Sequence, residues 1–210
     1  MTAGERTDTN EPGPSPPGEP MVGFGAKQAW LAIRDTDADA VSAVLGLTDL
    51  GPVSWRAGVD LSYLTDDRVV LTPPLPGASG TDWLLVAGRW LVQTSSIVDI
   101  VTLSDLLATE VQYFATHRVV ELHRWQRAND GELLRSFAYL GETGEVTDWR
   151  GEPDEVERAI GLPAVLDDDE DTDILVGEAD VMRVAAAWSL APVDLDGLPS
   201  PGPLRAAAVP

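Results

Sequence analysis

The sequence predicts a single α+β domain with an antiparallel sheet and helices packed largely on one face. Short apolar runs of strand length follow one another without the regular helix crossovers of βαβ units. A hairpin signal lies near residue 130. The chain has 210 residues, of which 44% are hydrophobic and 23% are charged, which is close to the globular average.

The two ends of the chain are predicted to be tails. Residues 1–24 are rich in proline and glycine and carry little apolar surface to offset their conformational entropy, so we expect disorder there. Prolines recur after residue 190, and residues 191–210 are expected to form a loose C-terminal tail. The α+β domain is therefore assigned to residues 25–190.

The first half of the domain reads as strand, helix, helix and two strands. Ala29–Ile33 is a short apolar run, typical of a strand. Residues 35–37 supply an N-cap, apolar residues then recur at helical spacing over Ala38–Leu45, and Gly46 is a plausible stop. A short helix is expected over Trp55–Leu64, and strands are expected at 68–72 and 83–87.

The second half is organised around the hairpin. Two strand-like runs flank Asn129-Asp130-Gly131, which fits a three-residue loop with glycine in the left-handed conformation. That loop places Ala128 opposite Glu132 and Trp125 opposite Arg135. The two runs are Val119–Arg127 and Leu133–Leu140; a helix at 103–108 and a strand at 110–115 precede them, and helices at 153–160 and 178–190 follow.

Composition excludes several classes of protein. The chain has no cysteine, so a disulfide scaffold, a thiolate metal site and a cysteine nucleophile are impossible. The formal net charge is −21, which opposes binding to nucleic acid and to anionic membranes. No apolar run is long enough to span a bilayer and the chain starts without signal-peptide features, so we expect a cytosolic protein.

The same charge favours a basic protein partner. Charge complementarity accelerates the encounter of two proteins. The leading hypothesis is therefore a cytosolic, non-enzymatic interaction or regulatory protein, for example one of the immunity type that neutralises a basic partner. No cofactor and no metal are expected.

One side of the hairpin is the candidate ligand site. It carries aromatic planes, forked arginine donors suited to carboxylate or phosphate, and a histidine that titrates near neutral pH. An anionic small molecule bound there, with or without catalysis, is the alternative function. Cation–π and aromatic pairs are also ordinary cross-strand stabilisers, so core packing under the C-terminal helix is the favoured interpretation of this side. The residues concerned are His123, Trp125, Arg127, Arg135 and Tyr139.

Two further motifs carry weaker signals. His117 lies between two strand-like runs and has no nucleophile at a catalytic spacing, so a capping or hydrogen-bonding role is favoured over that of a base or ligand. The acidic run Asp167–Asp173 alternates like a cation loop, but Gly177 and Glu178 do not fall at the offsets of a helix–loop–helix calcium site. A solvated loop is the favoured interpretation.

The chain contains EVQYFATHRVVELHRW at residues 110–125, continued by residues 135–142, and AAAWSL at residues 185–190. These segments resemble an uncharacterised family of bacterial proteins of about this length. The resemblance covers most of residues 28–195 and implies one domain over that range. It implies no activity, cofactor or site residue.

Overall fold

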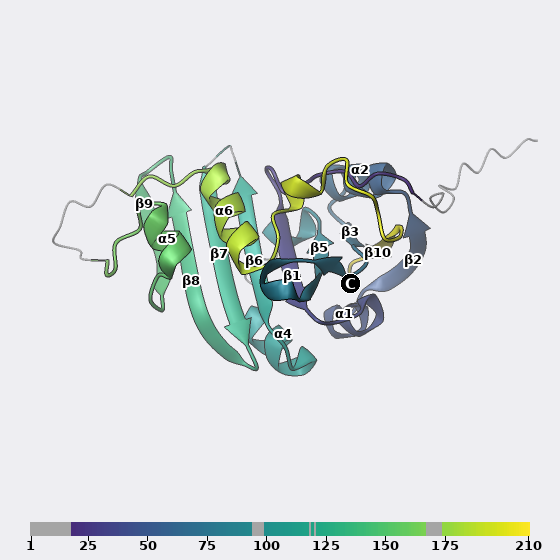
Figure 1. Ribbon diagram of the computed structural model, residues 1–210, viewed down its shortest axis with the longest axis horizontal. Coiled ribbons are helices and arrows are strands. Elements are labelled where there is room, and N and C mark those ends of the chain that lie inside the picture. The colour runs from purple at the N-terminus through teal and green to yellow at the C-terminus, as the bar shows by residue number, and fades with distance from the viewer. Residues whose placement is uncertain (1–17, 94–98, 118, 120, 167–173) are drawn as a thin grey trace, which may run out of the picture.

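One antiparallel sheet forms the centre of the fold (Figure 1). The computed structural model describes residues 18–93, 99–117, 119, 121–166 and 174–210. Within these residues the protein is a single α+β domain with ten strands and six α-helices, so the predicted fold class is confirmed.

Every strand of the sheet is antiparallel to its neighbours. The central strand β1 (Ala29–Arg34) is buried along almost its whole length, which explains its uninterrupted apolar sequence. Across the sheet the order is β2 (Thr48–Val53), β10 (Leu204–Ala208), β3 (Arg68–Leu71), β5 (Asp82–Ala87), β1, β6 (Val111–His117), β7 (Leu122–Asn129), β8 (Glu132–Leu140) and β9 (Glu145–Arg150), with β4 (Leu75–Pro76) also paired to β5.

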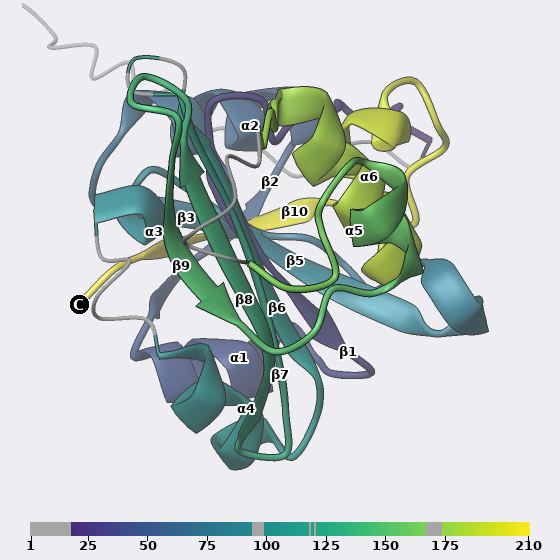
Figure 2. The same cartoon turned by 90° about the vertical axis from the view of Figure 1, so that its left-hand side faces the viewer.

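The helices cover both faces of the sheet, not largely one as predicted. Figure 2 shows α1, α3 and α4 on one side of the strands and α5 and α6 on the other. The reason is that alternate residues of β1 and β5 enter two separate apolar clusters, so both faces need a cover. One face carries α1 (Ala38–Leu45), α3 (Trp90–Gln93) and α4 (Ile100–Leu107); the other carries α2 (Trp55–Leu64), α5 (Glu155–Ala159) and α6 (Glu178–Trp188).

Local sequence signals set the helix boundaries. The Asp37 carboxylate accepts hydrogen bonds from the Asp39 and Ala40 amides, which begins α1 as predicted. Gly46 ends it with φ 67°, a left-handed conformation that costs glycine little. Ser54 caps α2 in the same way by accepting from the Ala57 amide.

The C-terminal residues are not a loose tail. Leu204, Ala206 and Ala207 are buried, and β10 lies between β2 and β3. The prediction failed because prolines dominate residues 192–203, whereas the strand itself is a short run of small apolar residues. The segment before it bends over a short 3₁₀ turn (Pro192–Leu195).

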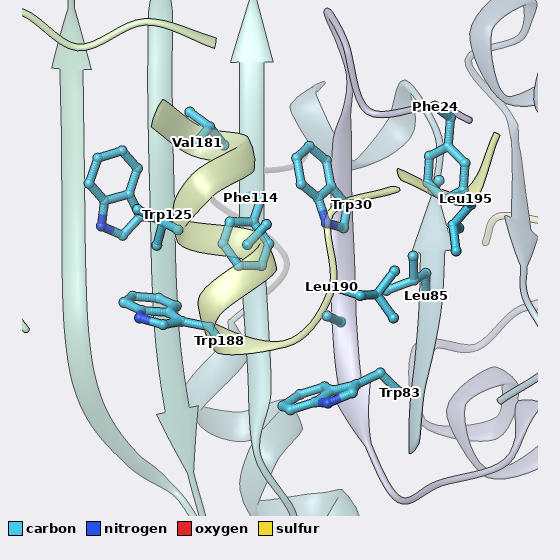
Figure 3. Packing of buried hydrophobic residues seen from close by; sticks show 14 of the residues in the cluster. Phe24, Trp30, Trp83, Leu85, Phe114, Trp125, Val181, Trp188, Leu190 and Leu195 are labelled. Carbon is cyan, nitrogen blue, oxygen red and sulfur yellow. The ribbon is translucent and has the colours of Figure 1, made fainter. Parts of the chain in front are cut away.

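The predicted N-terminal tail, residues 1–24, lies partly outside the residues that the structure describes. Residues 1–17 are not described, but the rest of the predicted tail packs on the domain. The Met21 amide donates to the Leu198 carbonyl at 2.8 Å, and both Met21 and Phe24 are buried. Figure 3 shows Phe24 beside Leu195, so this segment is held by the residues that lead into β10.

An aromatic cluster fills the space between α6 and the sheet (Figure 3). Trp30 stacks on Phe114 with ring centroids 5.1 Å apart, and Trp125 stacks on Phe137 at 4.3 Å. Trp188 comes from the last turn of α6 and meets Phe114 at 6.0 Å. Large buried rings of this kind contribute strongly to core stability.

Candidate functional site

The β7–β8 hairpin uses a tighter turn than the sequence predicted. Asp130 (φ 45°) and Gly131 (φ 78°) form a two-residue loop, as is typical of a type I′ turn. Asn129 therefore pairs with Glu132, and a bulge follows between Arg127 and Ala128. The register is shifted from the predicted one by one residue between the turn and the bulge, and by two residues beyond the bulge. Because side chains alternate with period two, those beyond the bulge still lie on their predicted faces.

The five predicted site residues do share one face, but that face is core. Trp125 pairs with Phe137, not with Arg135 as predicted. The exposed fractions are 0% for Trp125, 3% for Arg135, 3% for Tyr139 and 7% for His123. Helices α5 and α6 cover this side, so the core interpretation of the pattern is confirmed.

Arg135 is neutralised inside the protein. Its Nε donates to Glu157 Oε1 at 2.8 Å, and its Nη1 donates to the carbonyls of Ser136 and Arg150 at 3.0 Å each. Its guanidinium lies 4.4 Å from the ring centre of Trp149. Trp125 Nε1 donates to the same Glu157 oxygen at 2.7 Å. These contacts neutralise the positive charge of Arg135, which was predicted to bind an anionic ligand.

Arg127 is also held by a carboxylate of the chain. Its Nε lies 2.7 Å from Glu110 Oε1, and its guanidinium lies 5.6 Å from the Trp188 ring centre. Its side chain keeps 34% of its surface exposed, whereas the Glu110 side chain keeps 6%. The hairpin face is therefore a covered network of ion pairs and aromatic rings, which excludes it as an open anion site.

His123 differs from the other four residues because it lines a hollow. The hollow has a volume of about 330 Å³ and lies where the start of α6 meets the start of β7. These two element ends lie at the upper edge of the sheet in Figure 1. We call it the acidic pocket. Its lining residues are Glu121, His123, Val176, Gly177 and Glu178.

The two glutamates reach the acidic pocket from different elements. Glu178 lies in the first turn of α6, where the helix dipole favours an anion, and its Oε2 accepts from the Lys27 amide at 3.2 Å. Glu121 lies just before β7 with φ 46°, an uncommon conformation for a residue with a side chain. Its side chain packs on Gly141, where a Cβ would lie 2.5 Å from Glu121 Oε2.

The surroundings of His123 favour the uncharged form of its imidazole. Burial lowers its pKa below the ordinary 6.5, and the charges of Glu178, Glu121 and Asp180 only partly oppose this effect. Its Nδ1 is buried and has no hydrogen-bond partner. The acidic pocket is therefore lined by two carboxylates and by a ring whose buried Nδ1 is unpaired.

Of the pocket residues, only His123 is predicted as a site residue from the sequence. The residues just before β7 meet the segment before α6, which lies about fifty residues later in the chain. No local sequence pattern predicts a contact of this range. Glycine at the N-cap of α6, followed by Glu178, was the one available signal. His117 ends β6 opposite Leu122 and is half-buried with Nδ1 unpaired, while the acidic run 167–173 lies outside the described residues.

Neither a metal cluster nor a membrane span is found in the part of the chain that the structure describes. No three His, Asp or Glu side chains there are arranged to hold a metal ion. None of the helices there is both long and apolar enough to cross a bilayer. A scan of protein-family models gave no match, and searches of curated proteins and of solved structures gave none either.

Proposed function

We propose that this is a cytosolic interaction or regulatory protein whose partner is a basic protein. The supporting observation is that most of the described arginines form ion pairs within the chain. Eight of the eleven arginines that the structure describes are already paired with carboxylates of the same chain. They are Arg34, Arg68, Arg89, Arg127, Arg135, Arg150, Arg183 and Arg205.

The acidic surplus is not neutralised within the chain. Acidic residues exceed basic ones by 21, and the internal pairs consume most of the available arginine. A surface of one sign raises the association rate of an oppositely charged protein and repels nucleic acid. An immunity-type protein that neutralises a basic toxin is one form of this function.

Native mass spectrometry of the protein purified gently from its own host cytosol tests the proposal. We expect a retained protein of defined mass and positive net charge. Its association rate with the purified chain, measured by stopped-flow fluorescence, should fall steeply as the salt concentration rises. A bare monomer, or a partner whose association rate ignores salt, would contradict the proposal.

A further inference from the structure

We propose that the outer edge of β9 binds an extended, basic segment of the partner by strand addition, an inference that rests on the function proposed above. In strand addition, a peptide pairs with the unpaired backbone groups of an edge strand and so lengthens the sheet. The described sheet has two edges, β9 and β2, which lie at its opposite ends in Figure 1. Backbone direction, charge and side-chain alternation all favour β9 as the edge that accepts a strand.

The backbone of Trp149 points away from the sheet. The Gly141 amide donates to the Glu121 carbonyl at 3.0 Å, so from Gly141 back along β8 the odd-numbered residues direct their backbone groups to β7. The even-numbered residues of β8 then face β9, where their partners include Asp148 and Arg150. Trp149 lies between these two, and neither its amide nor its carbonyl has a hydrogen-bond partner among the described residues. An added strand would find one open donor and one open acceptor there.

The opposite edge is less suited to the same interaction. Strand β2 contains Pro52, which has no amide to donate, and its pairing with β10 leaves Leu50 out of the register. Prolines and bulges are the devices by which native sheets protect an edge. Strand β9 also has a bulge, at Thr147, but it contains no proline, and residues 148–150 keep their register with β8.

The charge around β9 selects a basic strand and disfavours a second copy of the chain. Residues 142–155 carry six acidic side chains and one basic side chain, Arg150, which already lies 3.5 Å from Asp148. The acidic residues are Glu142, Glu145, Asp148, Glu152, Asp154 and Glu155. Two copies joined through β9 would bring these like charges together, which is unfavourable across neighbouring strands. A strand that carries lysine or arginine would instead form opposite-charge pairs.

The two faces of β9 define the sequence pattern of that strand. Side chains alternate across a strand, and here Asp148 lies on one face while Val146 and Trp149 pack against the apolar cluster on the other. A partner side chain beside Asp148 therefore meets a carboxylate, and the next one along meets the apolar edge of the core. Strand addition takes affinity from the backbone and specificity from such alternate side chains. The fitting occupant is a segment in which basic and apolar residues alternate.

Hydrogen exchange, measured by NMR spectroscopy on the full chain, is the first test. The Trp149 amide should exchange at least roughly tenfold faster than the amides of Asp148 and Arg150, which face β8. A capped hexapeptide of alternating lysine and valine, at about ten times its dissociation constant, should slow Trp149 exchange roughly tenfold. A capped peptide of three lysines followed by three valines has the same charge without the alternation and should not. A Trp149 amide that is already protected, no slowing by the alternating peptide, or equal effects of the two peptides would overturn the proposal.

The second test uses the partner retained from the host cytosol. Glu145→Lys reverses a charge on the edge strand and should raise the dissociation constant of the complex roughly tenfold. Glu132→Lys makes the same change in net charge at the far end of the hairpin and should alter that constant less than roughly twofold. A basic partner that binds both variants equally, or that leaves Trp149 exchange unchanged, would overturn the role of β9 while leaving the proposed function intact. If the wild-type chain retains no basic partner, the proposed function fails, and the role of β9 in it fails as well.

Discussion

The buried ion pair between Arg135 and Glu157 allows a quantitative test of how the hairpin is held to α5. The side chains keep 3% and 0% of their surface, and Nε and Oε1 are 2.8 Å apart. Three variants are needed: Glu157→Gln, Arg135→Met and the double substitution. Arg183 and Asp180 form a comparable pair at 3.0 Å on the surface, so Arg183→Met is the matched control.

The expected costs follow from which charge remains buried. Glu157→Gln leaves the Arg135 cation with carbonyl acceptors only, and Arg135→Met leaves the Glu157 carboxylate with only the Trp125 indole and the Asp154 amide as donors. Stranding one charge in this way costs about 3–5 kcal/mol. The double substitution leaves no charge, so it should cost at least about 2 kcal/mol less than the sum of the single ones. The exposed control should cost less than about 1 kcal/mol.

Urea unfolding followed by tryptophan fluorescence and circular dichroism measures these free energies of unfolding. The m-value must stay unchanged, so that the three variants share one unfolded reference state. If Glu157→Gln costs no more than Arg183→Met, the pair is not desolvated and the account of the hairpin face is wrong. Additive single substitutions would show that the two charges do not interact.

Three further outcomes follow from burial. Burial raises the pKa of Tyr113 from 10.0 to about 12, so the unfolded chain releases this proton first. The free energy of unfolding should therefore fall by about 3 kcal/mol as the pH rises from 10 to 12. Tyr113→Phe should reduce that loss in alkaline urea titrations. The His123 pKa is lowered, so the unfolded state takes up its proton first, and the free energy of unfolding should fall as the pH drops below about 6.5. His123→Gln should make this fall shallower. An unchanged dependence of the unfolding free energy on pH would refute the lowered pKa of His123. Ala207→Asp buries a charge in β10 and should cost more than about 3 kcal/mol of unfolding free energy. Ala186→Asp on the exposed side of α6 should cost only about 1 kcal/mol, because helix propensity and the helix dipole disfavour Asp in the last turn. Similar thermal midpoints for the two variants would argue against a buried β10.

Local chemistry explains which parts of the fold were predictable. The Asp37 cap and Gly46 stop define α1 through contacts within a few residues, and the sequence carries those contacts directly. The hairpin was recognised from Asn129-Asp130-Gly131 as a three-residue loop, but its register was not, because aspartate tolerates the left-handed conformation that a two-residue turn needs. Short-range rules therefore identified the elements better than their pairing.

Long-range pairing explains what the sequence could not show. Arginines on the hairpin looked like a surface, because nothing in the sequence places Glu157 and Glu110 beside Arg135 and Arg127. His123 was identified as a candidate, yet its actual neighbour Glu178 comes from another element. Charge in a core can be inferred only once the partner that neutralises it is known.

The position of β10 also predicts the order in which the strands form during folding. Strand β2 joins the sheet only through β10, whose partners in β2 and β3 lie more than a hundred residues earlier. Closing so long a loop is entropically costly, so contacts of this range form slowly. We expect hydrogen exchange in refolding experiments to show protection of β6, β7 and β8 first, and of β2 together with β10 last. Until then the edge of β3 lacks a partner strand, which makes this intermediate the species most exposed to aggregation.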